Sequence, residues 1–163
     1  MRAYGIRDIK GCMAHILTKE TFDSFLLSEA KIVGKASFHI TGIPAKDFYR
    51  EEPLDESGYV AYGRLRDVLL SVIRGKETPE SFTLMFLLPR QKTEELIESS
   101  GSVLTPSDVE QLSLLVRFKE GELSVSTGSA YRIFTTDKTL NDAWDRWVEN
   151  FLTKHDLPWD VMA

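Results

Sequence analysis

Cysteine and histidine are scarce in this chain of 163 residues, which contains one cysteine and three histidines. The single cysteine, Cys12, cannot form a disulfide within the chain, so a disulfide framework is excluded and a reducing compartment is indicated. A structural zinc ion normally needs about four cysteine or histidine ligands. Cys12 and His15 can share one face of a helix, but Cys12 also belongs to an apolar stripe. We therefore expect no metal site and no bound cofactor.

Long apolar runs are also lacking, because the longest uninterrupted run is residues 84–88. A membrane-spanning helix needs about 20 apolar residues. Residues 1–8 have no apolar core of the length that a signal peptide carries, and neither end carries a lipidation motif. We expect a soluble, cytoplasmic protein with no membrane partner.

An excess of positive charge is missing as well, since the net charge is −5 and the isoelectric point is about 5.3. An acidic chain repels phosphate overall, so a nucleic-acid partner is not expected. Basic residues gather around 7–19 and 64–76, but Asp67 interrupts the second group. We interpret that group as the solvated face of a helix, with ion pairs between neighbouring side chains.

Sequence motifs of catalysis are absent: there is no Walker loop, dinucleotide-binding fingerprint, EF-hand, HExxH pair or G-x-S-x-G elbow. The paired acids at 51–52 and 94–95 fall in a charged loop and on a solvated helix face, where nothing raises a carboxyl pKa. Residues 126–129 (STGS) predict a strand end with a turn or bulge, or a backbone loop that binds an anion. No catalytic residue can be assigned.

What the chain does contain is a globular composition, with 42% hydrophobic and 28% charged residues. At this length one core can be filled and a second one cannot, so we expect a single domain over residues 1–163. Apolar periodicity predicts a strand at 2–6, a helix capped by Asp8, and two strands within 21–42. A charged surface loop at 43–58 follows.

The next predicted elements are a helix that ends at Gly75, a strand at 81–88 and a short helix at 90–99. Alternating residues on either side of 120–121 predict a β-hairpin, and a further strand is expected at 131–135. Together these elements predict an α+β fold, with a mainly antiparallel sheet with hairpins that is packed by about three to four helices on one or both faces.

The strongest pattern is a long amphipathic C-terminal helix. Thr139 with Asp142 forms a variant of the capping box, and Asp145 and Glu149 are among the residues expected on the solvated face. The apolar stripe consists of Leu140, Ala143, Trp144, Trp147, Val148, Phe151 and Leu152.

Three stretches carry a resemblance to a known family: residues 21–30 (TFDSFLLSEA), 73–79 (IRGKETP) and 134–140 (FTTDKTL), with Ala143-Trp144-Asp145 and Phe151-Leu152 further on. They resemble an uncharacterised family of small bacterial proteins, a domain of unknown function typical of anaerobic Firmicutes, over nearly the whole chain. The resemblance implies a bacterial, cytosolic protein made of one module. It implies no activity, cofactor or catalytic residue.

Three functions stay open from the sequence. The first is a non-catalytic binding or regulatory module with a protein partner or a second copy of the chain. The second is a small-molecule-binding protein or enzyme, and its candidate ligand-binding residues are Asp23, Ser24, Glu29, Thr127, Ser129 and Asp137. The third is a nucleic-acid accessory protein, because a strand-helix-strand-strand unit over 2–42 looks like part of a sliding-clamp domain, an analogy of topology alone. We rank them in this order.

Overall fold

The computed structural model describes residues 1–49, 54–74 and 77–162. Within these ranges, no helix is long and apolar enough to cross a membrane. The paired acids at 51–52 and the expected helix stop at Gly75 lie outside the described residues.

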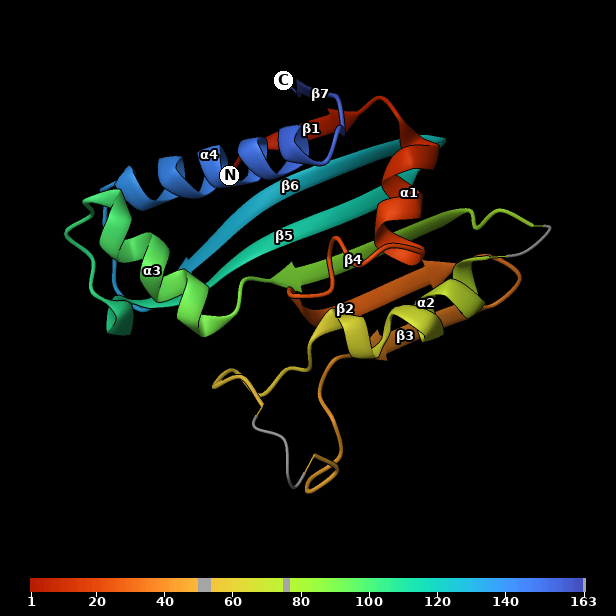
Figure 1. Ribbon diagram of the computed structural model, residues 1–163, viewed down its shortest axis with the longest axis horizontal. Helices are drawn as coiled ribbons and strands as arrows, with labels where there is room; N and C mark the ends of the chain where they lie inside the picture. Colours follow the sequence, from red (N-terminus) through yellow and green to blue (C-terminus); the bar gives the residue numbers. More distant parts are fainter. Residues whose placement is uncertain (50–53, 75–76, 163) are drawn as a thin grey trace.

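The seven strands of the described chain form one antiparallel sheet in the order β3-β2-β4-β5-β6-β1-β7 (Figure 1). The long central strands β5 and β6 make the expected hairpin. Its turn residues Glu120 and Gly121 both have positive φ, 54° and 78°, as a two-residue turn of type I′ requires. The strand bounds are β1 Ala3–Ile6, β2 Leu26–Val33, β3 Ser37–Thr41, β4 Ser81–Leu87, β5 Val109–Lys119, β6 Glu122–Tyr131 and β7 Trp159–Val161.

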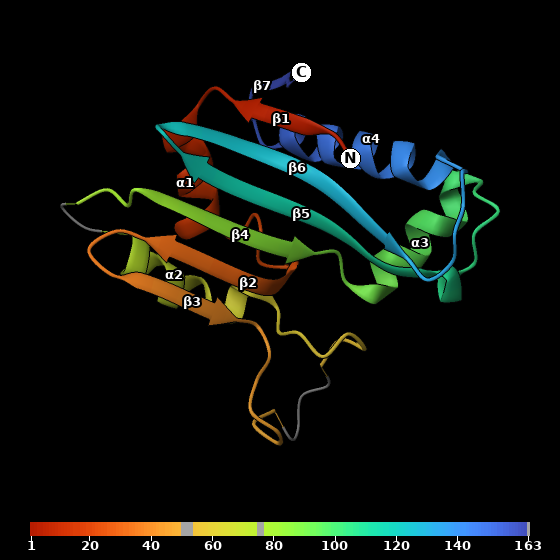
Figure 2. The same cartoon turned by 180° about the vertical axis from the view of Figure 1, so that it is seen from behind.

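The helices all lie on one face of this sheet, and Figure 2 shows the other face bare. The expected α+β class with an antiparallel sheet and a long C-terminal helix is confirmed. The α-helices are α1 Ile9–Leu17, α2 Arg66–Ile73, α3 Arg90–Ser100 and α4 Thr139–Lys154, and the 3₁₀ turns are η1 Tyr62–Arg64 and η2 Pro106–Asp108.

Alternation along each strand explains this one-sided arrangement, because successive side chains of a strand point to opposite faces. In β5, Leu112, Leu114 and Val116 are buried under the helices, whereas Ser113 and Arg117 point to the bare face. Most side chains on the bare face are small or polar, and the paired apolar side chains Met85 and Leu115 on it are partly buried, so one layer of helices covers the sheet.

An aromatic cluster joins the helix layer to the sheet. Phe86 of β4 is fully buried, and its ring centroid lies 5.3 Å from that of Phe22 and 4.9 Å from that of Tyr62. Phe151 of α4 adds an edge-on contact with Phe22, also at 5.3 Å. Rings at these distances contribute beyond the apolar area that they bury. The cluster therefore links α4, β4 and the segment before β2.

Two strand predictions were wrong. The strand expected at 131–135 is absent from the described chain, because β6 runs without a break to Tyr131 and a loop follows. Gly128 lies inside β6 opposite Ser113, and a side chain at that glycine would meet the Ser113 hydroxyl. The short strand β7, which pairs with β1, was not expected.

Two predictions about α4 were wrong as well. Thr139 and Asp142 do not form a capping box; instead, the Asp137 carboxylate accepts hydrogen bonds from the Thr139 amide (3.1 Å) and hydroxyl (2.7 Å). Asp145 is buried rather than solvated. By contrast, the Asp8 cap of α1 is confirmed, since the Asp8 carboxylate accepts a hydrogen bond from the Gly11 amide at 3.0 Å.

The aromatic cluster gives a direct prediction for stability. We expect Phe86→Ala to lower the free energy of unfolding by about 3–5 kcal/mol, because it leaves a cavity inside packed rings. The matched control is Phe134→Ala, whose ring is 93% exposed, and its effect should stay within about 0.5 kcal/mol. Urea unfolding followed by circular dichroism measures both. Equal losses in the two variants would contradict the packing described.

Candidate functional site

Three of the six predicted site residues, Asp23, Ser24 and Glu29, lie in or just before β2. Asp23 forms an ion pair with Arg66 of α2, with 3.1 Å between Oδ1 and Nε, and burial raises its carboxyl pKa above the ordinary value. Ser24 is exposed in the adjacent turn. Glu29 points to the bare face of the sheet, where its Oε2 lies 3.0 Å from His39 Nε2.

The other three lie near α4 and are engaged with the chain itself. Thr127 is buried and donates a hydrogen bond to the Asp145 carboxylate at 2.5 Å. The Ser129 hydroxyl donates to the Asn141 side-chain oxygen at 3.1 Å. Asp137 caps α4 and accepts a further hydrogen bond from Ser102 at 3.2 Å.

The structure therefore does not gather the six residues into one pocket. Thr127 and Ser129 of β6 both bond with side chains of α4, Asp137 precedes that helix, and Asp23 and Ser24 are neighbours in the chain, but Glu29 lies on the other face of the sheet. Most of their polar atoms already have partners within the chain. Ligand binding by these residues stays a prediction, and the geometry points to other places.

The Asp137 cap gives a pH-dependent prediction. Hydrogen bonds from Thr139, the hydroxyl first and then the amide, hold the pKa of the Asp137 carboxyl below its ordinary value of 3.8. A group whose pKa is depressed by folding adds stability above its unfolded pKa and loses it as the pH falls through the folded pKa. Asp137→Asn should thus melt below the parent protein near pH 7, and the gap should close in acid. Thermal unfolding across this pH range measures the gap; a constant gap would contradict the role.

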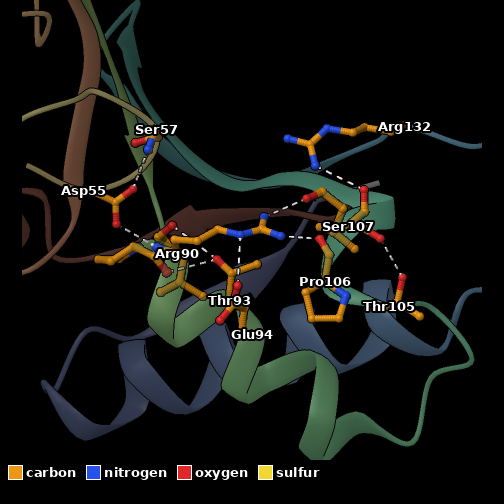
Figure 3. A network of polar contacts seen from close by, with 12 residues as sticks. Asp55, Ser57, Arg90, Thr93, Glu94, Thr105, Pro106, Ser107 and Arg132 are labelled. Atoms are coloured by element: carbon orange, nitrogen blue, oxygen red, sulfur yellow. Dashed lines mark hydrogen bonds and ion pairs between the residues drawn. The ribbon is translucent and has the colours of Figure 1, made fainter.

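A polar network at one end of the sheet surrounds Arg90, the first residue of α3 (Figure 3). Its guanidinium donates from Nη1 to the carbonyl oxygen of Val109 (2.6 Å) and from Nη2 to that of Pro106, while Nε lies 3.4 Å from a carboxylate oxygen of Glu94. Arg132 donates to the carbonyl oxygen of Ser107 at 3.1 Å. The hydrogen bonds of the Arg90 side chain therefore hold η2 and β5 against α3.

Asp55 closes this network from a distant part of the chain. Its Oδ2 accepts the Arg90 backbone N–H at 2.8 Å, and its Oδ1 accepts that of Ser57 at 2.9 Å. The residue before α3 is Pro89, which offers no side-chain cap, so a carboxylate from another segment satisfies the helix N-terminus. A cavity of about 350 Å³ lies beside the network, but its lining mixes acids such as Glu56 and Glu110 with arginines.

We expect Asp55→Ala to lower the free energy of unfolding by about 0.5–2 kcal/mol, the usual loss for a helix cap. Glu56→Ala is the control, since Glu56 is exposed on the same segment and should change stability by no more than about 0.5 kcal/mol. Chemical unfolding compares the two. A loss that is the same for both variants would show that the Asp55 contact does not stabilise α3.

An apolar groove opens between α1 and α2, on the helix side of the sheet. Its volume is about 480 Å³, within the range of roughly 300–1,000 Å³ that is typical of ligand pockets. Phe82 of β4 and Phe118 of β5 form its floor, with their rings stacked at 5.4 Å. The walls are Ile9, Met13, Ala14 and Leu17 from α1 and Leu70 and Ile73 from α2, and Pro79 completes the apolar lining.

A few polar groups border this apolar lining. Thr18 and Thr78 contribute hydroxyls, and Arg74 follows the last turn of α2. Arg74 is exposed, and its side chain has no hydrogen bond or ion pair with any other residue that the structure describes. An apolar cavity with a few polar groups at its border is the usual chemistry of a small-molecule site. An unpaired guanidinium there favours an anionic group.

The groove was not found from the sequence, although its residues belong to predicted elements. The apolar stripe of α1 was recognised, but a stripe does not reveal whether a neighbouring helix covers it completely. For the second helix, apolar spacing predicts a stripe that leaves out Leu70 and consists of Tyr62, Leu65, Val68, Leu69, Val72 and Ile73. In the structure Leu70 lines the groove, whereas Val68 is 45% exposed. The α-helix begins at Arg66, and Tyr62 belongs to the 3₁₀ turn η1 before it.

The reactive side chains of the described chain include a hydroxyl beside a histidine, because Thr21 Oγ1 lies 2.7 Å from His15 Nδ1. Cys12 is fully buried, and burial raises the pKa of its thiol to about 12. His15 and His155 form a ring contact at 5.7 Å, and burial lowers the pKa of both. No group of three or more histidine, cysteine, aspartate or glutamate residues within the described ranges can hold a metal ion.

Comparison with known proteins identifies a family. A family model described as a family of unknown function (DUF5721) matches residues 15–160. Neither a curated protein nor a solved structure matches the chain.

Proposed function

The chain belongs to this family of unknown function, and we propose that it is a non-catalytic binding module whose ligand is a small apolar molecule with an acidic group. The groove between α1 and α2 takes the apolar part, and Arg74 pairs with the acid. One observation carries the proposal: the groove has an apolar floor and walls, a volume of about 480 Å³, and an unpaired cation beside it.

The burial of the groove residues supports this assignment. Phe82 is 4% exposed, so the floor is rigid and part of the core, while Met13 and Leu70 are only half-buried. Covering such half-exposed apolar side chains with a ligand removes them from water, which favours binding by about 25 cal/mol per Å² of apolar surface. A preformed groove also avoids the cost of ordering side chains on binding.

A binding role without catalysis is supported by the state of the titratable groups. The Cys12 thiol stays protonated at neutral pH, since the thiolate is the nucleophile and the pKa is about 12. The groove itself contains no histidine, aspartate or glutamate. A buried free thiol also supports the cytoplasm as the compartment of the protein.

The test uses two probes of equal chain length, dodecanoate and dodecanol, titrated into the purified protein and followed by calorimetry. We expect dodecanoate to bind and dodecanol to bind more weakly, because only the acid pairs with Arg74. Leu70→Gln should weaken dodecanoate binding roughly tenfold or more, since a buried leucine contributes about 1.5–3 kcal/mol and 1.4 kcal/mol is a factor of ten.

Ser71→Gln is the matched control, because Ser71 is exposed on the same helix and does not line the groove. It should bind dodecanoate as the parent protein does. The proposal fails if neither probe binds, or if the Leu70 and Ser71 variants bind dodecanoate equally well.

A further inference from the structure

The edge strands of the sheet are β3 and β7, and they differ in length. β7 has three residues, whereas β3 has five, with the sequence SFHIT, which holds no proline, lysine or acid. Lysine, proline and very short strands are the usual means of keeping an edge unpaired. β3 has none of these protections, so its backbone is available to another strand.

The backbone groups that β3 presents outward belong to alternate residues. Gly42 N–H donates to the carbonyl oxygen of Ser28 at 3.0 Å, and the register with β2 is unbroken from Ser37 to Thr41. In an antiparallel pair, alternate residues direct their N–H and C=O groups to the same neighbour. Phe38 and Ile40 therefore bond with β2, and Ser37, His39 and Thr41 face the free edge.

The side chains of β3 are similar on the two sides of His39: an apolar residue is next to it and a small hydroxyl residue follows on each side. A twofold axis at His39 would pair Phe38 with Ile40 of a second copy on the helix side, and Ser37 with Thr41 on the bare side. A twofold interface requires this self-complementarity, since each patch meets a copy of itself. Each His39 at the axis keeps Glu29 of its own chain at 3.0 Å.

The surroundings of β3 contain much of the exposed apolar surface of the described chain. Six of its twelve exposed large hydrophobic residues fall between positions 33 and 68. Val68 of α2 and Phe38 border the free edge on the helix side, at 45% and 36% exposure. Exposed apolar side chains beside an unpaired edge indicate a contact surface. The remaining members of this group are Val33, Ile43, Phe48 and Leu54.

The segment after β3, residues 43–49, is here called the arm, and in both views it projects past the β3 edge (Figures 1 and 2). The Arg64 guanidinium lies over the Tyr49 ring at 5.4 Å and ties the arm to η1. Phe48 is 71% exposed, although part of its side chain lines a cavity with Val60 and Leu65. The arm thus leaves most of a large apolar side chain in solvent near the β3 edge.

At the opposite end of β3 is a cavity of about 200 Å³, here called the notch, with apolar walls formed by Ile32, Phe38 and Val72. A twofold axis in the middle of β3 exchanges the two ends of the strand. The arm of each copy therefore falls at the notch of the other, and Phe48 has an apolar site to enter.

The size of the contact also calls for the arm. The five residues of β3 make an edge about 17 Å long, at roughly 3.4 Å per residue. A stable interface buries roughly 800 Å² of surface on each partner. The strand alone is too short for that area. Val68 of α2, which is 45% exposed, and two arms seated in two notches supply the rest.

We propose that the partner of this edge is a second copy of the chain, joined by antiparallel pairing of β3 with β3 and by insertion of each Phe48 into the other copy's notch. The result is one continuous sheet across the two copies. Arg74 and Pro79 line both the notch and the groove between α1 and α2, so the oligomeric state is measured in the absence of the proposed ligand.

Sedimentation velocity over a range of protein concentrations tests the proposal. The parent protein should sediment as a dimer that dissociates on dilution. His39→Pro should be monomeric, because it removes an outward N–H without breaking the ladder to β2. Phe48→Asp should also be monomeric, because it removes the apolar group from the arm, and its position outside the core preserves the fold.

Phe134→Asp is the matched control for the arm variant, since Phe134 is also exposed, at 93%, in the loop between β6 and α4, and it should remain a dimer. Circular dichroism confirms that each variant is folded; if His39→Pro does not fold, Phe48→Asp decides. A parent protein that is monomeric at every concentration overturns the proposal. So does a dimer that survives Phe48→Asp or is lost in Phe134→Asp.

Discussion

The packing of aromatic side chains on one face of the sheet is the constraint on which the rest of the structure depends. Phe86 in β4 meets Phe22 and Tyr62, and α4 reaches the same cluster through Phe151. These contacts hold residues from 22 to 151 in one layer. The opposite face carries mostly small and polar side chains, and its paired Met85 and Leu115 are partly buried. Most of the apolar surface that must be covered therefore lies on the helix side, where several helices cover it together.

The helices leave apolar surface uncovered in two places, and we assign both surfaces to binding. Where α1 and α2 diverge, the stacked pair Phe82 and Phe118 is the floor of an open groove. Where the layer ends at β3, α2 leaves Val68 exposed beside an unpaired strand. The polar network around Arg90 is different in kind, because its groups are bonded to one another and to backbone carbonyls. It fastens α3 to β5 rather than offering free groups to a ligand.

The elements that the sequence predicted best are those with strict periodicity and a local stop signal. The β5–β6 hairpin, the helix from Arg90 that ends before Gly101, and α4 all follow from spacing within one segment. Predictions failed where a distant segment decides the outcome. Strand β6 extends to Tyr131 because Val109 of β5 pairs with that residue. Asp145 is buried because its carboxylate accepts a hydrogen bond from Thr127 of β6. The cap of α3 is Asp55, which is 35 residues away in the sequence from Arg90. The candidate site failed to assemble for the same reason, since small polar residues in a sequence indicate turns and caps as readily as ligands.

The most direct test of this account is a map of backbone amide shifts by nuclear magnetic resonance, recorded with and without dodecanoate. If the incomplete helix layer is the binding surface, the amides of α1 and α2 and those of Phe82 and Phe118 should shift together. Those of β6, α3 and the Arg90 network should remain in place. Shifts centred on the bare face of the sheet or on the Arg90 network would contradict the claim that binding takes place where α1 and α2 leave the sheet uncovered.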